Sequence, residues 1–296
     1  MKRYWIFIVF GLAFSITSLR SQEEPINCFT SSSSRKTVEW IYGGVEADKC
    51  EIPFYAYIRV TRRQKGEEFE SYCGGSILSG NWILSVGHCF TRFVSGNVYT
   101  GVTDVDKLET DPIVKKHEIT EVIRHPDFGS VDRRWLKNDI ALIKVEPAIQ
   151  FSRAVGIVLL SRNPNFHSPM NYVIYGVGNS GYDAEGSAIY SPLLRYASVP
   201  LIPNEECQRL YQAVGEHKKL QPHYFCAGSN HRGAIRGDSG GPMTAGDGNI
   251  QVGIIQGGLA YNSSTALEQA KYPGIFVKVG DYCDWIRETT EEVGCL

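Results

Sequence analysis

Short runs of strand-forming residues, separated by turn residues, constrain the fold of this chain more than any other feature. Typical runs are FYAYIRV, WILSVG, IALIKV, QVGIIQ and GIFVKV, which begin at Phe54, Trp82, Ile140, Gln251 and Gly274. Glycine, proline, asparagine and aspartate interrupt the sequence between them. This spacing is typical of antiparallel sandwiches and barrels. We expect an all-β fold with only two helices, one with Asn204 as its N-cap and one over residues 281–292.

The amino terminus predicts export. Lys2 and Arg3 precede an apolar run over residues 5–16, and small polar residues follow it. The run is shorter than the roughly 20 apolar residues that span a bilayer, so a signal peptide over residues 1–21 explains it better than a membrane anchor. Eight cysteines agree with an oxidising compartment. We expect a secreted, extracellular protein with a propeptide or exposed linker over residues 22–40.

Composition narrows the choice of partners. The chain has 296 residues, 43% of them hydrophobic, which is enough for one large or two ordinary domains with a buried core. A net charge of −2 provides no basic surface for nucleic acid, and no later segment is long and apolar enough to cross a membrane. We expect a monomer with no nucleic-acid partner and no membrane attachment after the signal peptide is removed.

The stretch AIRGDSGGPM, residues 234–243, admits three interpretations. Arg-Gly-Asp is an adhesion tripeptide, G-x-S-x-G is the nucleophile turn of α/β-hydrolases, and G-D-S-G-G-P is a different nucleophile turn. An α/β-hydrolase carries its catalytic histidine after the serine, and none of the seven histidines follows Ser239. The tripeptide alone is a weak signal, whereas the hexapeptide is expected by chance about once in 10⁵ chains of this length. We therefore interpret Ser239 as a nucleophile.

A serine nucleophile needs a base and a group that orients the base. His88 ends an apolar strand and adjoins Cys89, and Cys73 is well placed to close a disulfide around it. Asp139 opens the strand of NDIALIKV, where a carboxylate can be shielded from water and directed at an imidazole. His125 lies in a loop, and the other five histidines lie in polar stretches that predict surface positions. The order His, Asp, Ser favours a catalytic triad over separate structural roles.

Six motifs in this order resemble the chymotrypsin-like serine proteases from Ile41 to the C-terminus. They are IYGG (41–44), GHC (87–89), NDIALIKV (138–145), FCAG (225–228), GDSGGP (237–242) and YPGIFVKV (272–279). The resemblance implies two antiparallel six-stranded Greek-key β-barrels, with the active site between them and a C-terminal helix. We expect the protease domain over 41–296, with the first barrel at about 41–157, the second at about 158–280 and the helix at about 281–292.

The resemblance assigns a role to each triad residue. Ser239 attacks the scissile carbonyl, His88 transfers the proton, and Asp139 stays ionised and orients the imidazole. The backbone N–H groups of Gly237 and Ser239 form the oxyanion hole. The implied function is that of a secreted serine endopeptidase made as a zymogen, which acts on protein or peptide substrates and is a candidate target for a protein inhibitor.

Activation is expected between Trp40 and Ile41, because Asp238 in this family pairs with the amino terminus that the cut creates. This pairing would bury Asp238, which also argues against an adhesion role for Arg-Gly-Asp. Where trypsin-activated relatives carry Lys or Arg, this chain has VEW before the bond. We therefore expect cleavage by the enzyme itself or by a chymotrypsin-like partner.

The specificity pocket is expected to accept an uncharged P1 residue, the residue before the scissile bond. Gly233 stands where trypsin-like members hold an aspartate, and Gly258 and Gly274 occupy the wall positions. Arg232 and Arg236 suggest an acidic P1 residue as the alternative. We favour an apolar or aromatic P1 residue, because a buried unpaired guanidinium is costly.

The cysteines follow the family in part. The resemblance implies the disulfides Cys73–Cys89 and Cys207–Cys226. Two family bridges are lost as pairs, with Ile235 and Tyr261 in place of one and Tyr172 and Ala245 in place of the other. Four cysteines remain, and their three connectivities cannot be separated by sequence: Cys28, Cys50, Cys283 and Cys295. One of their bridges can tie the propeptide to the protease body.

Two residues beside the expected site depart from the family. Gln256 and Gly257 replace a serine that helps to hold the catalytic aspartate and a tryptophan that walls the cleft. These changes support an alternative function, that of a weakly active or inactive homologue that acts as a binding or regulatory protein.

Two further signals concern modification and metal binding. Asn262 begins the only N-x-[ST] sequon, in a polar loop, and is the expected glycosylation site. Val102 takes the first ligand position of the family's calcium loop, so we interpret Asp104 and Asp106 as solvated turn residues. We expect no metal and no cofactor.

Overall fold

The computed structural model describes residues 28, 41, 44–130, 136–162, 172–179, 181–183, 185, 187–217, 219–246, 248–259 and 262–296. The predicted signal peptide, Trp40, Tyr261 and all of the predicted propeptide except Cys28 lie outside these residues. No helix in the described part of the chain has the length and apolar character needed to cross a membrane.

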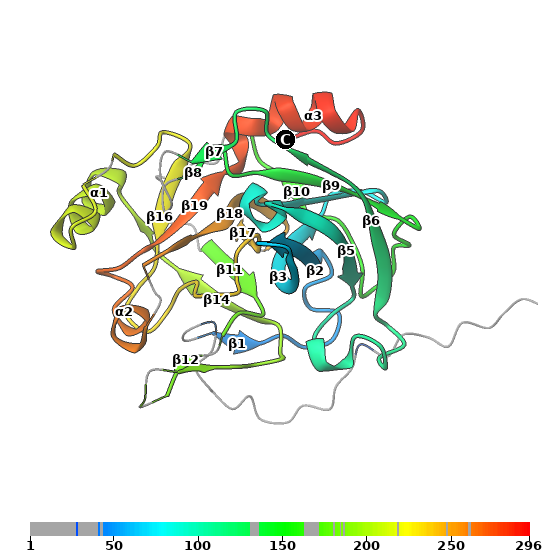
Figure 1. The fold of residues 1–296 in the computed structure, drawn as a ribbon, viewed down its shortest axis with the longest axis horizontal. Helices are drawn as coiled ribbons and strands as arrows, with labels where there is room; N and C mark the ends of the chain where they lie inside the picture. The colour runs from blue at the N-terminus through cyan, green and yellow to red at the C-terminus, as the bar shows by residue number, and fades with distance from the viewer. Residues whose placement is uncertain are drawn as a thin grey trace, which may run out of the picture.

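Six antiparallel strands close the first barrel, at the right of Figure 1, in the order β2-β3-β4-β9-β6-β5. They are β2 (Tyr55–Gln64), β3 (Glu67–Ile77), β4 (Trp82–Ser85), β5 (Phe93–Thr100), β6 (Lys115–Arg124) and β9 (Ala141–Glu146). β-Branched and aromatic residues suit a pleated, half-buried surface. Ile58, Ile83 and Ile143 are accordingly fully buried in the barrel core.

The second unit is a curled sheet of nine strands, in the order β1-β14-β11-β17-β18-β19-β16-β15 with β10 beside β18. The strands are β1 (Val45–Glu46), β10 (Leu159–Leu160), β11 (Tyr172–Gly176), β14 (Arg195–Val199), β15 (Leu201–Ile202), β16 (Tyr224–Ala227), β17 (Pro242–Ala245), β18 (Ile250–Gly258) and β19 (Gly274–Lys278). Pro200 separates β14, which pairs with β11, from β15, which pairs with β16. Because proline has no N–H to donate, the ladder breaks there and the chain turns between the two ends of the sheet.

Both units share one strand order, although the sequence contains no internal repeat. The longer strands of the second sheet are β11, β14, β16, β17, β18 and β19, and they pair in the same relative order as the six strands of the barrel. The prediction of two six-stranded antiparallel units is confirmed in this sense. Three two-residue strands are added to the second unit, and one of them, β1, comes from a segment that precedes the first barrel.

The helices differ from the prediction. The described residues form three α-helices rather than two: α1 (Asn204–Ala213), α2 (Ser263–Leu267) and α3 (Cys283–Thr290). Pro203, not Asn204, holds the N-cap position of α1. The unexpected α2 begins with a capping box. Asn262 Oδ1 accepts a hydrogen bond of 2.9 Å from the Thr265 N–H, and Thr265 Oγ1 accepts one of 3.3 Å from the Asn262 N–H.

The C-terminal helix lies at the top of Figure 1, across the first barrel. Its approach through Tyr282 and its Trp285 pack against His125, which follows β6, with ring centroids 5.4 and 5.2 Å apart. The helix ends at Glu291, which adopts a left-handed conformation. This packing ties the C-terminus to the barrel that carries the expected base.

Four disulfides brace the fold. Cys73–Cys89 and Cys207–Cys226 form as the resemblance implies, and the remaining cysteines pair as Cys28–Cys50 and Cys283–Cys295. Cys28 precedes the expected activation bond and Cys50 follows it. Where a family bridge is lost, Tyr172 and Ala245 face each other across β11 and β17.

Buried contacts fix the two units against each other. Ser76 of β3 donates a hydrogen bond of 2.7 Å to Gln251 of β18, and both side chains are fully buried. A β-carbon on Gly74 would lie 2.8 Å from the Cα of Gly241, so the two backbones can approach this closely only at glycine. The nucleophile motif is therefore pressed against the first barrel.

Candidate active site

His88 and Asp139 form a pair joined by two hydrogen bonds in the first barrel. His88 lies on η1 (Gly87–Phe90), a single 3₁₀ turn after β4, and Asp139 lies just before β9. The Asp139 carboxylate accepts a bond of 2.7 Å from His88 Nδ1 and one of 2.8 Å from the His88 backbone N–H. Asp139 is fully buried, whereas the His88 side chain is 27% exposed. The carboxylate therefore fixes the ring while the rest of the imidazole can reach a substrate.

Tyr224 supports this pair in a way that the sequence did not indicate. Its hydroxyl donates to the Leu136 carbonyl at 2.7 Å and accepts from the Asp139 N–H at 3.3 Å. Burial raises the pKa of this phenol, and the nearby Asp139 charge raises it further, so the hydroxyl stays protonated. Within the described residues no hydrogen bond joins Gln256, at the family's serine position, to Asp139. The aspartate is held from the Tyr224 side instead.

Ser239 lies in a tight turn between β16 and β17. Gly237 adopts a φ of 103°, a left-handed conformation that favours glycine. The Ser239 carbonyl accepts from the Gly74 N–H at 2.8 Å, and the neighbour of Gly74, Cys73, is disulfide-bonded to Cys89 beside His88. A short path of one hydrogen bond and one disulfide thus links the serine turn to the segment of His88.

The two N–H groups expected to form the oxyanion hole, those of Gly237 and Ser239, donate no hydrogen bond to other described residues. The next turn amides are used differently, since Gly240 donates to Ile255 O at 2.8 Å and Gly241 to Asp238 O at 2.9 Å. These two bonds anchor the turn and leave the two expected donors available to an incoming carbonyl oxygen.

Asp238 is completely buried beside this turn. Its carboxylate accepts from the Gly178 N–H at 2.8 Å and from the Ile235 N–H at 2.9 Å. Burial raises its pKa from 3.8 to about 6, although these backbone bonds and Arg195 act in the opposite direction. Ile41 is 3% exposed and packs into the core of the second sheet, but no hydrogen bond joins it to Asp238. Trp40, the other residue of the expected activation bond, lies outside the described residues.

Two of the three expected pocket glycines are paired, and the third faces a glutamine side chain. Gly258 and Gly274 face each other across β18 and β19. Gly233 is buried and faces the side chain of Gln269, a residue that sequence reasoning missed. Arg232 and Arg236 are both exposed, so neither guanidinium is buried near Gly233. This arrangement weakens the alternative of an acidic P1 residue.

Several polar residues differ from their predicted surroundings. His117 is buried, not on the surface, and its ring nitrogens bond to Thr100 and to the Pro147 carbonyl at 3.2 and 2.7 Å. Burial accordingly lowers the pKa of His117. Asp104 is not simply solvated, because it caps the turn of η2 (Val105–Lys107) and pairs with Lys107. Among the described residues no three His, Cys, Asp or Glu side chains are grouped as a metal site would require.

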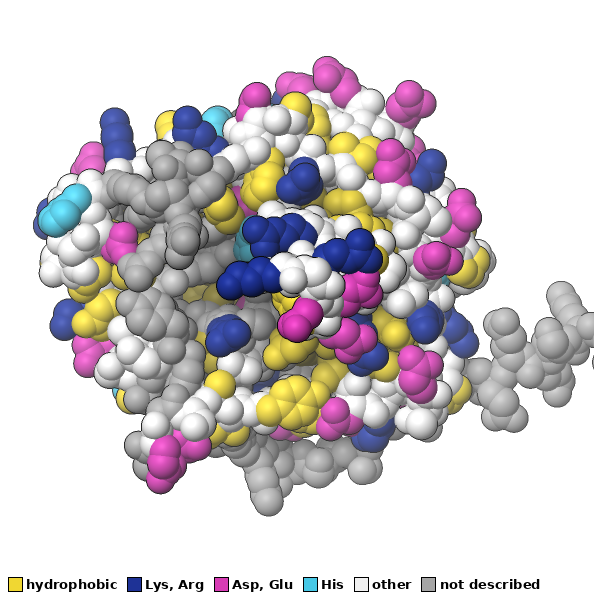
Figure 2. Space-filling model, in the orientation of Figure 1, with side chains coloured by type: hydrophobic (Ala, Val, Ile, Leu, Met, Phe, Trp, Pro, Cys, Tyr) yellow, Lys and Arg dark blue, Asp and Glu magenta, His cyan; other side chains and the backbone are white. Residues whose placement is uncertain are grey.

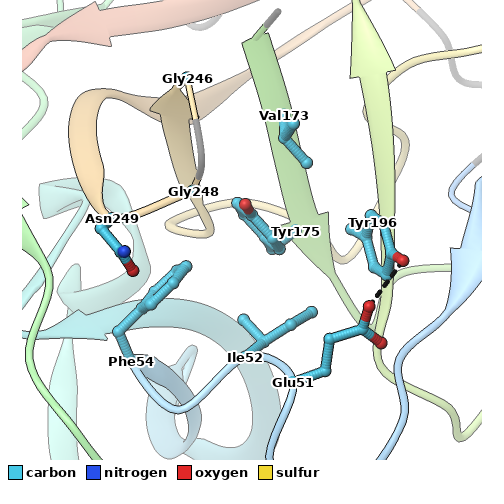
Figure 3. Close-up of a pocket in the computed structure, with 9 residues that line it drawn as sticks. All are labelled: Glu51, Ile52, Phe54, Val173, Tyr175, Tyr196, Gly246, Gly248 and Asn249. Atoms are coloured by element: carbon cyan, nitrogen blue, oxygen red, sulfur yellow. Dashed lines mark hydrogen bonds between the residues drawn. The ribbon is translucent and has the colours of Figure 1, made fainter.

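A cavity lies between residues of the first barrel's approach and the second sheet. It measures about 240 Å³ and is lined by the residues labelled in Figure 3: Glu51, Ile52, Phe54, Val173, Tyr175, Tyr196, Gly246, Gly248 and Asn249. Figure 3 shows the Tyr196 hydroxyl pointing to the Glu51 carboxylate, to which it donates a bond of 2.8 Å. None of the expected catalytic residues lines this cavity.

The surface in Figure 2 carries charges of both signs. Basic side chains near the middle of this face have acidic side chains beside them. Such mixing gives no continuous field of one sign on this face.

Comparison with known proteins agrees with this geometry. The profile of the trypsin family matches residues 41–286. Trypsin II-P29 of Gallus gallus is 30% identical over 254 residues, which cover 84% of this chain and 88% of that protein. Trypsin 5G1 of Aedes aegypti is 28% identical over 84% of this chain and 85% of its own length. The venom peptide isomerase heavy chain of Agelenopsis aperta is 27% identical over 83% of this chain and 98% of its own length.

Proposed function

Because the chain belongs to the trypsin family of chymotrypsin-like serine proteases, we propose that it is a secreted serine endopeptidase made as a zymogen. The observation that carries this proposal is the pair of His88 and buried Asp139, joined by two hydrogen bonds and linked to the turn of Ser239 through Gly74 and the Cys73–Cys89 disulfide. A carboxylate in this position fixes the imidazole tautomer and stabilises the imidazolium that forms during reaction.

The proposed reaction proceeds through an acyl-enzyme. Ser239 Oγ bonds to the scissile carbonyl carbon as His88 takes the serine proton, and the N–H groups of Gly237 and Ser239 bind the oxyanion. His88 then gives that proton to the leaving amine as the peptide C–N bond breaks. Water, deprotonated by His88, attacks the ester, and the proton returns to Ser239 as the acid product leaves.

The competing proposal is a weakly active homologue that binds other proteins, and the exchange of the family's serine and tryptophan for Gln256 and Gly257 favours it. A fluorophosphonate probe separates the two. Stoichiometric labelling of Ser239 in protein with a verified Ile41 amino terminus supports the enzyme. Absence of labelling in that same protein supports the binding function, with Ser239→Ala as the unlabelled control.

Activation is proposed at the Trp40–Ile41 bond. The near-complete burial of Ile41 and of Asp238 supports a role for both in the second sheet once the new amino terminus exists. Amino-terminal sequencing of secreted wild-type and Ser239→Ala protein tests the proposal. An Ile41 terminus in wild type only indicates self-cleavage, and the same terminus in both indicates another protease. An active enzyme without an Ile41 terminus contradicts the proposal.

The pocket is proposed to accept uncharged P1 residues, apolar or aromatic. No carboxylate stands at Gly233, and the nearby guanidinium groups of Arg232 and Arg236 are exposed. A peptide-library cleavage profile of the activated enzyme, with Ser239→Ala as control, tests this preference. Efficient cleavage after Lys or Arg contradicts it.

The sequon offers a proposed glycosylation site in the connection between β18 and β19. Asn262 is exposed, and it caps helix α2 through Oδ1, the atom that a glycan does not use. A mass shift on enzymatic deglycosylation that is absent from Asn262→Gln tests this site.

A further inference from the structure

The amide of Gln269 is buried without a hydrogen-bond partner. Gln269 is fully buried, and neither its Oε1 nor its Nε2 bonds to a described residue. Buried polar groups in proteins are almost always hydrogen-bonded, because an unpaired amide in an apolar surrounding opposes folding. Such a group points to a ligand that supplies the missing bonds.

This amide occupies the place of a side chain at position 233. A β-carbon built on Gly233 would lie 1.8 Å from Gln269 Oε1 and 2.4 Å from its Cδ. Any side chain at Gly233 would therefore overlap the glutamine. The amide of Gln269 fills the space that the first atoms of a side chain at position 233 would occupy. In trypsin-like relatives that side chain contacts P1.

Backbone contacts hold Gln269 in this position. Leu267, at the end of α2, accepts a hydrogen bond of 2.8 Å from the His231 N–H, and Asn230 bridges to Glu268. A β-carbon on Gly228 would lie 3.0 Å from the Gln269 carbonyl oxygen. The segment after α2 is thus packed along the segment that leads to Gly233, which places the side-chain amide of Gln269 next to Gly233.

We infer that Gln269 forms the floor of the specificity pocket and selects an aromatic P1 residue with a polar far end, Tyr first and Trp second, over Phe. This inference rests on the proposed function. Oε1 accepts and Nε2 donates, so a phenol hydroxyl can bond to both. An indole N–H satisfies Oε1 alone, and a phenyl ring leaves both atoms unpaired. A site that hydrogen-bonds a substrate group rejects the analogue that lacks it.

The surroundings of the floor favour an aromatic ring above it. The paired Gly258 and Gly274 form one stretch of sheet without side chains, so a flat ring can lie against this backbone surface. A neutral amide offers no counter-charge to Lys, Arg, Asp or Glu. The bond expected to be cut in activation follows Trp40, whose indole N–H is a donor that Oε1 can accept.

Matched substrates test the inference directly. Fluorogenic peptides that differ only at P1 (Tyr, Trp, Phe, Leu or Gln) are compared by kcat/KM with wild type, Gln269→Leu and Gln212→Leu. Gln212 is an exposed glutamine of α1 and serves as the control for the same substitution. We expect wild type and Q212L to prefer Tyr over Phe by about tenfold or more. In Q269L this ratio falls to about one while cleavage after Phe is retained.

Three results would overturn the inference. These are equal rates for Tyr and Phe in wild type, an unchanged ratio in Q269L, and a preference for Leu or Gln at P1. Thermal unfolding supplies a separate check, because leucine in place of an unpaired amide should leave the melting temperature unchanged or raise it. A large drop in the melting temperature of Q269L would show that the amide is bonded in the folded protein, which also contradicts the inference.

Binding to a catalytically dead protein separates this inference from the proposed function. Product peptides ending in Tyr or Phe are titrated by calorimetry into Ser239→Ala and into the double variant S239A/Q269L, both cut at the Trp40–Ile41 bond by an added chymotrypsin-like protease and verified by their Ile41 amino terminus. A Tyr preference that Q269L removes supports the floor even if wild type cleaves nothing, in which case only the proposed function fails. Active wild type with no Tyr preference in either assay refutes the floor and leaves the proposed function standing.

Discussion

In the first barrel, His88 is held by hydrogen bonds within its own unit, whereas the turn of Ser239 in the second sheet is held in part by the first barrel. Asp139 grips His88 at two points inside the barrel. The Ser239 carbonyl instead accepts a hydrogen bond from Gly74 of the other unit. The same turn contains Asp238, a buried carboxyl whose pKa is raised to about 6. Two units with the same strand order therefore hold their site residues in different ways.

This difference teaches where control of activity can reside. A base that is positioned by the barrel core is ready as soon as the protein folds. A nucleophile turn that depends on a buried carboxyl can be set by a later event, such as the arrival of a charged amino terminus. Four predictions test this contrast.

The largest expected effect comes from removing a triad group on either side. His88→Ala and Ser239→Ala, in different units, should each lower kcat/KM by about 10⁴-fold or more, because the triad acts as a unit. The double variant should lose little more. Steady-state kinetics on protein with a verified Ile41 terminus measures this, and near-wild-type activity of either single variant would contradict the mechanism.

Asp238→Asn should affect only the second side. Losing the charge that sets the oxyanion donors should lower kcat by about 10²-fold to 10³-fold. The NMR resonance of the proton between His88 and Asp139 should stay in place, since the barrel is untouched. A shift of that resonance would show that the two sides are coupled, and full activity of D238N would remove Asp238 from the mechanism.

The uncleaved chain should lose stability as pH rises through the range set by Asp238. Its folded pKa lies above the ordinary value of 3.8, at about 6, so between these values the folded state binds more protons than the unfolded state. The contribution of Asp238 to the free energy of unfolding should therefore fall by about 2 kcal/mol from pH 4 to pH 6. Denaturant titrations of Ser239→Ala measure it, and S239A/D238N should lack this component.

Arg195 is the charged side chain that acts on Asp238 from β14, and Tyr55 of the first barrel is a titratable group near it. Arg195 stays protonated between pH 4 and pH 6. Tyr55 stays neutral there, because burial raises its pKa well above the ordinary value of 10.0. A stability difference between Ser239→Ala and S239A/D238N that stays constant over this range would contradict the assignment to Asp238.

The smallest expected effect concerns Tyr224. Tyr224→Phe removes the hydroxyl that accepts the Asp139 N–H and should lower the free energy of unfolding by about 1 kcal/mol. We expect kcat to fall several-fold with KM unchanged, because the base is held less firmly. Tyr282→Phe, whose hydroxyl donates to Asn138 Oδ1 at 3.0 Å, is the matched control and should change kcat less. Equal effects of the two would make Tyr224 merely structural.

Patterns within a few residues predicted most of the fold. The strand-like run from Trp82 matches β4, and the run from Gly274 matches β19, because alternation and turn residues are local signals. Helix α2 was missed because the stretch AYNSSTALEQ is polar. The spacing of Asn262 and Thr265 was the available signal, since these two residues form the capping box.

Contacts between distant segments were beyond the sequence. The pairing Cys28–Cys50 was one of three connectivities that spacing could not separate. Gln269 and Tyr224 stand in ordinary surroundings, and each gains meaning only from what the fold brings to it, Gly233 in one case and Asp139 in the other. Single-residue roles of this kind depend on tertiary packing, which local propensity does not encode.

The disulfide Cys28–Cys50 bears on what becomes of the severed segment. It spans the Trp40–Ile41 bond, so the proposed hydrolysis there yields two polypeptides that travel as one molecule, heavier than the precursor by a single water. The prosegment is not diluted away but stays at high effective concentration beside the enzyme. Departure of the peptide therefore cannot drive activation forward. A reductant, by releasing this piece, would alter the composition of a mature protease that cleavage alone leaves whole.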